Sequence, residues 1–377
     1  MSKYSISYND IVSINKIKDV YDGIYKNTCH KAKLVRFELT KTSNIVKIYN
    51  TLNNKHYNHL KYNIFIIREP KYRIIMSELM YDKIVNHLIS KYVLIPTLSR
   101  KLIEQNVATR TGKGSKEGIR YMKKYINSIK ENYDNIYILK CDISKYFYNI
   151  DHEILINRLS YENFDKDILK ILINIINSTD NNYINDLIDS SISREVSHLE
   201  DMNIYDLELR KKQLYSLPRY RKGKGLPIGN ETSQLLAIYY LNELDHYIKE
   251  QLHIKYYIRY MDDFILIHHD KEYLKKCLNL INKKLSSLKL SLNKKTQIYN
   301  LKSGVNFLGY KFILKNKKLI ILLNNQTRKK IKRKLKKARK NDINFYKKSL
   351  ASYNGYFKIS TTNNFVYKNK FFLEEGN

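Results

Sequence analysis

Two adjacent carboxylates, Asp262 and Asp263, lie inside residues 258–267, a run whose other side chains are mostly apolar and favour a β-strand. Partly buried carboxylates that stand side by side repel each other, so at least one keeps its proton unless a cation lies between them. A structural alternative exists, because Asp-Asp is also a common dipeptide at the solvated tip of a hairpin. We favour the metal site, because it gives the pair a chemical role.

A third carboxylate, Asp142, ends an apolar run at residues 137–142. If this strand lies beside the hairpin, three carboxylates converge at strand ends. That arrangement suits two Mg²⁺ ions about 4 Å apart, which activate a 3′-hydroxyl and stabilise a leaving pyrophosphate. The predicted metal ligands are Asp142, Ile143, Asp262 and Asp263, with Mn²⁺ as a substitute ion. The alternative for Asp142 is a helix cap, which leaves Asp262 and Asp263 unexplained.

The segment Tyr-Met-Asp-Asp at 260–263 resembles the active-site hairpin of reverse transcriptases, and five other segments resemble motifs of that family in the same order. The other five are residues 68–74, 142–147, 225–234, 292–296 and 306–310. The resemblance as a whole extends over roughly residues 60 to 360. The resemblance implies an RNA-directed DNA polymerase that uses dNTPs, an RNA template and a DNA product.

The same motifs imply roles for single residues. A first group binds the nucleotide: Arg68, Lys71, Arg73, Phe147, Ile228, Gly229, Ser233 and Gln234. A second group forms the primer grip: Phe307, Leu308 and Gly309. Lys295 is a general acid for pyrophosphate, or else a solvated lysine. Phe147, five residues after Asp142, excludes a ribose 2′-hydroxyl, or else it is a core aromatic residue. Gly229 lets the backbone approach a base or phosphate closely, and it also suits a turn before a helix.

Two positions depart from the common family pattern. Many reverse transcriptases carry Gln and Pro where this chain has Ile228 and Gln234. In this respect the chain is similar to bacterial enzymes of diversity-generating retroelements and of stand-alone antiviral defence. A diversification role implies an accessory protein as a partner, and a defence role implies a noncoding RNA or an effector protein. Two alternatives stay open: a template-independent or protein-primed DNA polymerase, and a catalytically idle nucleic-acid-binding scaffold.

The order of the helices and strands expected around these residues predicts an α+β fold with an antiparallel sheet. The resemblance makes this a right-hand polymerase with a ferredoxin-like palm. The expected division is an N-terminal helical extension at 1–60, fingers at 61–134, a palm at 135–314 and a basic helical thumb at 315–377. Residues 179–223 are expected to be an insertion in the palm, with a helix or two outside the core.

Local signals give further expectations. Asp151 and Asp165 should each cap a helix, and Ile331, Leu335 and Ala338 should form the narrow packing stripe of a basic helix. We expect Ser77 to cap a helix that ends near residue 94, and Thr232 to cap one that ends near residue 252. Residues 256–260 and 264–268 should form a hairpin. Residues 291–299 and 305–314 should each form one strand, followed by helices to the end of the chain.

The charge balance favours a polyanionic partner. The 377 residues include 69 Lys and Arg against 36 Asp and Glu, a net charge of +33. Residues 311–340 carry fourteen Lys or Arg and no acid, which favours phosphate contacts by Lys332, Lys336 and Arg339 over the alternative of AT-rich codon usage. No apolar stretch suits a membrane span. The scattered cysteines Cys29, Cys141 and Cys277 fit a reducing cytoplasm.

Overall fold

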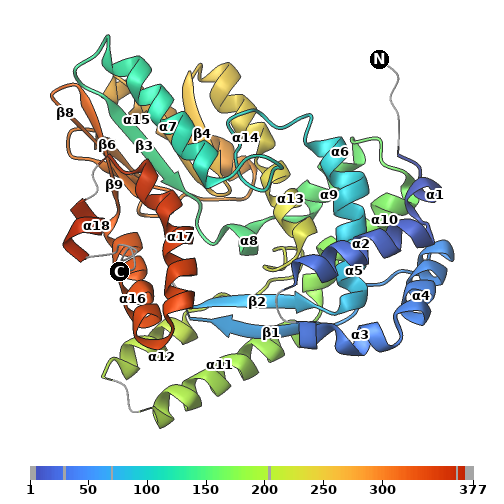
Figure 1. The fold of residues 1–377 in the computed structure, drawn as a ribbon. Coiled ribbons are helices and arrows are strands. Elements are labelled where there is room, and N and C mark those ends of the chain that lie inside the picture. Colours follow the sequence, from blue (N-terminus) through green and yellow to red (C-terminus); the bar gives the residue numbers. More distant parts are fainter. Residues whose placement is uncertain (1–5, 29–30, 69–70, 203–204, 362–363, 370–377) are drawn as a thin grey trace. The chain divides into compact units, whose positions relative to one another are not determined.

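The computed structural model describes residues 6–28, 31–68, 71–202, 205–361 and 364–369. The chain divides into two compact units. The first comprises residues 1–103, 143–245 and 284–291, and the second comprises residues 104–142, 246–283 and 292–377. Figure 1 shows the elements of both units and labels most of them. The mixture of helices and antiparallel strands confirms the expected α+β class.

The first unit is mostly helical. Its early helices are α1 (Tyr8–Ile11), α2 (Ile14–Asn27), α3 (Val35–Leu39) and α4 (Lys41–Asn53), with a 3₁₀ turn at Lys31–Leu34. After the strands come α5 (Met80–Ile89), a π-helical turn at Ser90–Leu94 and α6 (Ile95–Leu98). The later helices are α8 (Tyr146–Asn149), α9 (His152–Ser160), α10 (Lys166–Ile176), α11 (Tyr183–Asp201), α12 (Leu207–Tyr215), α13 (Glu231–Tyr240) and most of α14 (Asn242–His246), with a 3₁₀ turn at Asn177–Asp180.

The strands of the first unit form one hairpin, β1 (Tyr62–Ile67) and β2 (Arg73–Glu78), paired from Tyr62↔Glu78 to Ile67↔Arg73. Ser77 therefore lies in a strand, and the prediction that it caps a helix is wrong. The following helix begins only at Met80. Residues 74–76 are apolar and lie in the sheet because they pair with β1 and pack into a core. This is a tertiary effect, which local helix signals cannot predict.

Helix α11 packs on this hairpin, and its buried face, including Ile184, Ile188 and Ile192, shares a core with Tyr62 and Met76. The expectation that residues 179–223 lie outside the core is therefore wrong. Three acidic residues of this helix, Asp186, Asp189 and Glu200, are exposed on the opposite, solvent side, as in an amphipathic helix.

A partly buried acid, Glu78, ends β2. Burial raises the pKa of the Glu78 carboxyl to about 8, the nearby Asp82 and Glu231 carboxylates add to the rise, and Lys83 opposes it. The Oε1 atom of Glu78 is buried with no hydrogen-bond partner in the described part of the chain. The folded first unit therefore favours the protonated acid.

A second correction concerns Thr232. Helix α13 begins at Glu231 with Asn230 as its N-cap residue. Thr232 is instead fully buried, and its hydroxyl donates to the Asn86 side chain. The helix also ends at Tyr240, before the expected position. By contrast, Asp151 and Asp165 cap α9 and α10 as the sequence suggests.

The second unit contains two antiparallel sheets. The strands of the first, in spatial order, are β4 (Tyr256–Tyr260), β5 (Asp263–His268), β3 (Tyr137–Asp142) and β6 (Gln297–Asn300). Those of the second are β7 (Val305–Phe307), β8 (Tyr310–Lys315) and β9 (Lys318–Leu323). The helices are α7 (Ser115–Lys130), a π-helical turn at Tyr247–Gln251, most of α15 (Lys271–Ser287), α16 (Asn325–Asn341), α17 (Ile343–Ile359) and α18 (Asn364–Asn369).

Two expectations about the C-terminal third are corrected here. Residues 305–314 form two strands because Leu308 and Gly309, both with positive φ, turn the chain between β7 and β8. The basic block at 311–340 begins as the β8–β9 hairpin and becomes helical only at Asn325. Ile331, Leu335 and Ala338 are the buried residues of α16, as its sequence suggests.

Two remaining expectations concern cysteines and membranes. Cys141 and Cys277 are free and buried, and Cys29 lies outside the described residues. Across the described ranges, no helix combines the length and apolar character that a bilayer span requires.

Candidate active site

Strand pairing brings Asp142 and Asp263 opposite each other. Strand β3 runs antiparallel to β5 from Tyr137↔His268 to Asp142↔Asp263, so the two aspartates end the ladder as Cα partners. Asp262 precedes Asp263 in the turn between β4 and β5. The expected placement of the Asp142 strand beside the hairpin is therefore present. It follows from the apolar faces of both strands, which join one buried core.

The arginine before this turn was not singled out from the sequence. Arg259 is fully buried and donates from Nη1 to the main-chain oxygen of Met261 at 2.9 Å. Met261 has φ +58°, a left-handed conformation that is uncommon for a residue other than glycine. Arg259 thus helps to fix the turn that carries Asp262. A basic residue inside an otherwise apolar strand is unusual, and this could have drawn attention to Arg259 from the sequence alone.

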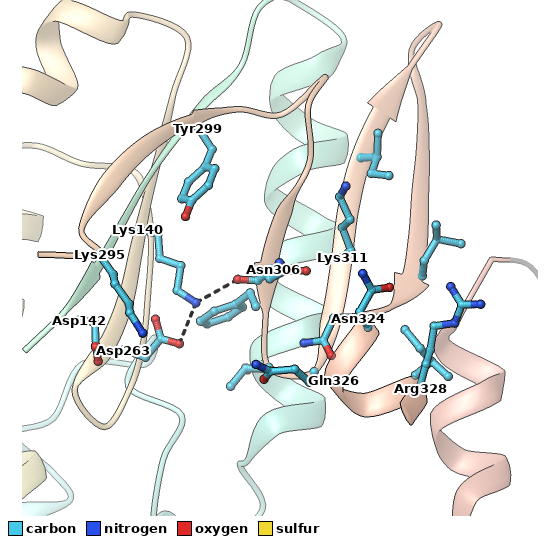
Figure 2. Close-up of a pocket in the computed structure, with 17 residues that line it drawn as sticks. Lys140, Asp142, Asp263, Lys295, Tyr299, Asn306, Lys311, Asn324, Gln326 and Arg328 are labelled. Atoms are coloured by element: carbon cyan, nitrogen blue, oxygen red, sulfur yellow. Dashed lines mark hydrogen bonds and ion pairs between the residues drawn. The ribbon is translucent and has the colours of Figure 1, made fainter. Parts of the chain in front are cut away.

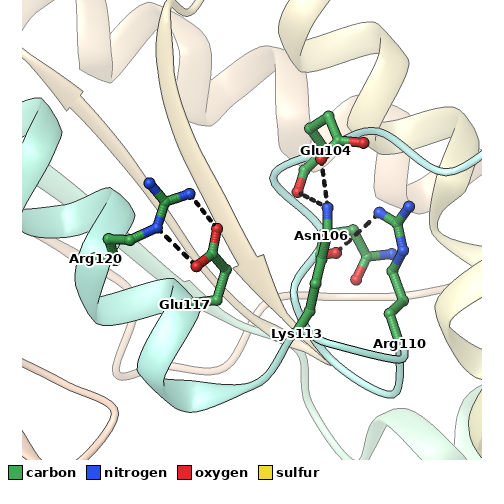
Figure 3. Close-up of polar contacts among 6 residues, drawn as sticks. All are labelled: Glu104, Asn106, Arg110, Lys113, Glu117 and Arg120. Carbon is green, nitrogen blue, oxygen red and sulfur yellow. Dashed lines mark hydrogen bonds and ion pairs between the residues drawn. The ribbon is translucent and has the colours of Figure 1, made fainter.

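The main chain of Arg259 is also held by the loop before α7. Arg259 N–H donates to Gln105 O at 3.0 Å, and Val107 N–H donates to Arg259 O at 3.0 Å. Figure 3 shows how charged side chains fix this loop: Lys113 binds the main chain and carboxylate of Glu104, at 2.8 and 2.6 Å. Arg110 donates to the main-chain oxygen of Asn106 at 3.2 Å. The turn that carries Asp262 therefore follows a strand end whose main chain is hydrogen-bonded on both sides of Arg259.

Asp142 and Asp263 line a cavity of about 940 Å³ (Figure 2). The Asp263 Oδ2 atom lies 3.3 Å from Lys140 Nζ, and its Oδ1 atom is buried without a hydrogen-bond partner among the described residues. Burial raises the pKa of the Asp263 carboxyl to about 6, the Lys140 ammonium opposes the rise, and the Asp142 and Asp262 carboxylates add to it. The Lys140 ammonium therefore compensates the negative charge of the ionised Asp263 carboxylate only in part.

The donor set fits a hard divalent cation. Carboxylate oxygens are the ligands that Mg²⁺ prefers, and the buried Oδ1 of Asp263 supplies one without another partner. Within the described ranges, however, no group of three or more His, Cys, Asp or Glu side chains stands close enough to hold a metal ion. The expected convergence of three carboxylates is thus incomplete. One reason is that Asp263 turns an oxygen toward Lys140.

The segment 292–296 is tied directly to Asp142. Asn293 N–H donates to the Asp142 main-chain oxygen at 2.7 Å, and Asp142 N–H donates to Thr296 Oγ1 at 3.4 Å. This anchoring brings Lys295 to the wall of the same cavity, where Figure 2 shows it beside Asp142 and Asp263. Lys295 therefore lies on the wall of the cavity that holds Asp142 and Asp263. Its role in proton transfer stays a prediction.

The predicted primer-grip residues also reach this cavity. Phe307, Leu308 and Gly309 line it, and the main-chain oxygen of the preceding Asn306 accepts a hydrogen bond from Lys140 at 3.0 Å. The structure therefore unites Asp142, Asp263, Lys295 and the 307–309 turn in one unit. Lys140 and Asn306 were missed from the sequence. The signal for Lys140 was its place two residues before Asp142 on a strand, which puts both side chains on one face.

The predicted nucleotide-binding residues belong to the first unit. Arg68 forms an ion pair with Glu195 at 2.5 Å, while Lys71 and Arg73 are exposed. Glu69 and Pro70 of the same motif lie outside the described residues. Phe147 is half-buried in α8, and Ser233 is fully buried in α13 next to the exposed Gln234.

Gly229 has a specific structural reason to be glycine. Its φ is +143°, and a Cβ atom there would lie 2.5 Å from the main-chain oxygen of Met76. The preceding Ile228 accepts a hydrogen bond from Met76 N–H at 2.9 Å. The motif at 225–234 is therefore bound edge-on to β2, so that the close approach is to protein backbone.

Residues 67–312, more than half of the 377, match the profile of the family described as reverse transcriptase (RNA-dependent DNA polymerase). No curated protein matches the sequence. Among solved structures, telomerase from Candida albicans in complex with a fragment of telomeric RNA is similar at 14% identity and a TM-score of 0.44. The alignment covers 87% of this chain and 61% of that one.

Proposed function

The chain belongs to the reverse transcriptase family, and we propose that it synthesises DNA on an RNA template from dNTPs. The observation that carries the proposal is the pairing of Asp142 with Asp263 at the end of the β3–β5 ladder, on the wall of a 940 Å³ cavity. Together with the family match, two opposed carboxylates in a cavity of this size support nucleotidyl transfer assisted by divalent cations.

In this proposal Asp142 and Asp262 are direct metal ligands, Asp263 offers a third carboxylate to the same metal site, and Ile143 follows Asp142 in the chain. Bound Mg²⁺, for which Mn²⁺ can substitute, supplies Lewis-acid activation of the primer hydroxyl and charge stabilisation at the leaving group. The protein supplies the carboxylate oxygens and a turn braced by Arg259. Lys295, on the cavity wall, is proposed to give a proton to the departing pyrophosphate.

The nucleotide is assigned to residues of the first unit. Lys71 and Arg73 are exposed cations suited to a triphosphate, and Arg73 offers the bidentate fork. Arg68 needs to release Glu195 before it can join them. We further propose that Phe147 excludes ribonucleotides. Ile228, Gly229, Ser233 and Gln234 are proposed to support the base, and the hydrogen bond from Met76 N–H to the Ile228 main-chain oxygen fixes the first part of this segment to β2.

The primer and template are assigned to the second unit. Phe307, Leu308 and Gly309 are proposed to hold the primer end, since they line the same cavity as the carboxylates. Helix α16 offers exposed cations on several faces, including Lys332, Lys336 and Arg339, around a buried stripe of three residues. Such a helix fits phosphate contacts along a template–primer duplex. The names fingers, palm and thumb, with their boundaries, are part of this proposal.

For the biological role we propose bacterial antiviral defence or the diversification of a retroelement, in the cytoplasm. The support is the Ile228 and Gln234 pattern alone. The partner proposed for diversification is an accessory protein, and the partner proposed for defence is a noncoding RNA or an effector protein.

Template dependence tests the proposal. The purified full chain is given Mg²⁺, an oligo(dT) primer and dTTP, with poly(rA), with poly(dA) or without a template. We expect extension with poly(rA) that is absent without template. Equal extension without a template indicates the template-independent alternative. No extension in any arm, with duplex still bound, indicates the idle scaffold.

A further inference from the structure

Lys140 makes two contacts inside the cavity that holds Asp142 and Asp263 (Figure 2). Its Nζ atom lies 3.3 Å from Asp263 Oδ2 and donates to the main-chain oxygen of Asn306 at 3.0 Å. The side chains of Lys140 and Asp263 are only 25% and 29% exposed, so water screens the ion pair weakly. A resident cation therefore stands among the carboxylates to which the proposed function assigns metal binding.

The position of this cation has a cause in the strand pairing. Asp142 and Asp263 are Cα partners, and Asp262 adjoins them, so three negative charges are held near one another. Like charges this close destabilise the fold unless a cation compensates them. Lys140 emerges on the same face of β3 as Asp142 because the two residues are two positions apart. It is thus placed to neutralise Asp263 when no divalent ion is present.

Resting on the proposed function, we propose that Lys140 is a positioning residue that occupies Asp263 Oδ2 as a placeholder cation and withdraws when a divalent ion binds. The ammonium has three N–H donors, and the Asn306 carbonyl retains one of them after the exchange. The exchange therefore leaves neither the lysine nor the carboxylate without a partner. It also accounts for the incomplete three-carboxylate cluster, because Lys140 competes for one of its members.

Competition of this kind has a measurable size. A partly exposed ion pair stabilises by up to about 1 kcal/mol, and removing such a competitor tightens metal binding by up to about fivefold. A purely structural lysine predicts the opposite sign, because its loss loosens the site and weakens binding.

The test measures Mn²⁺ affinity of the full chain by electron paramagnetic resonance, without nucleic acid or nucleotide. We expect Lys140→Met to bind Mn²⁺ more tightly than the natural protein, by more than about twofold and by up to about fivefold. Lys140→Gln, which keeps a donor for Asn306, carries the same expectation if the methionine variant fails to fold. Lys140→Arg retains a cation and should stay within about twofold of the natural protein.

The matched control is Lys311→Met. Lys311 lines the same cavity from β8, and it forms no ion pair with the residues that the structure describes. Its loss removes the same formal charge without removing a competitor, so affinity should change by no more than about twofold. Unchanged or weaker binding in the Lys140 variants, or equal tightening in Lys311→Met, overturns the inference. Asp142→Asn separates the two proposals: if it binds Mn²⁺ as the natural protein does, the metal assignment itself is wrong.

Discussion

Gly229 provides a strict test of how the 225–234 segment is attached to β2. Replacing it with alanine adds a Cβ atom 2.5 Å from the main-chain oxygen of Met76, at a φ of +143°. The strained backbone costs about 1–3 kcal/mol. The clash involves backbone, which cannot rotate away as a side chain can, and overpacking of this kind costs a further 1–3 kcal/mol or so. We therefore expect Gly229→Ala to lower the free energy of unfolding by at least about 2 kcal/mol.

Urea unfolding followed by far-ultraviolet circular dichroism measures this loss, and the chain has no tryptophan to serve as a fluorescent probe. The matched control is Gly23→Ala, inside α2, where no described heavy atom lies within 4 Å of the new Cβ. That change should stabilise by about 0.5–1 kcal/mol because alanine favours helix. Hydrogen exchange should also show faster exchange at the Met76 amide in Gly229→Ala. Equal urea midpoints for Gly229→Ala and the natural protein would refute the reasoning.

Three further changes probe other parts of the account. Phe147→Ala should admit ribonucleotides, so an unchanged dNTP/rNTP ratio in primer extension removes its gate role. Changing Lys332, Lys336 and Arg339 to Gln should flatten the slope of log Kd against log salt for duplex by about one per lost contact, and an unaltered slope points to a solvated surface. Because the Glu78 pKa is raised to about 8, the natural protein should lose stability, up to about 4 kcal/mol, as the pH rises from 5 to 8. Glu78→Gln should remove most of that loss in urea titrations and leave the smaller part that Asp263 contributes, because its pKa is also raised, to about 6. An undiminished loss would assign it to other groups.

Much of the site was predictable because it rests on strongly patterned strands. The apolar runs around Asp142 and Asp263 predict two neighbouring strands, and their pairing follows once both bury a face in one core. The buried stripe of α16 was likewise visible as Ile331, Leu335 and Ala338. In each case the apolar residues recur at the spacing that places them on the buried face of the strand or helix.

The failures share a different physical cause, since each depends on a partner distant in the sequence. Ser77 and Thr232 look like helix caps locally, but the first pairs across β1 and the second donates to Asn86. Lys140 looks like an ordinary strand lysine until Asn306, 166 residues away, supplies its second contact. No local pattern contains such contacts.

The central claim is that the carboxylates at the β3–β5 strand ends carry the chemistry of DNA synthesis. Incorporation of a single dTTP on poly(rA) with an oligo(dT) primer, under saturating Mg²⁺, measures this directly. We expect Asp142→Asn and Asp262→Asn each to lower the rate by at least about a thousandfold, or about 4 kcal/mol, with duplex binding retained. Asp134→Asn, a change of the same type at a largely exposed position, should leave the rate unaltered. Near-natural incorporation by either active-site variant would contradict the account.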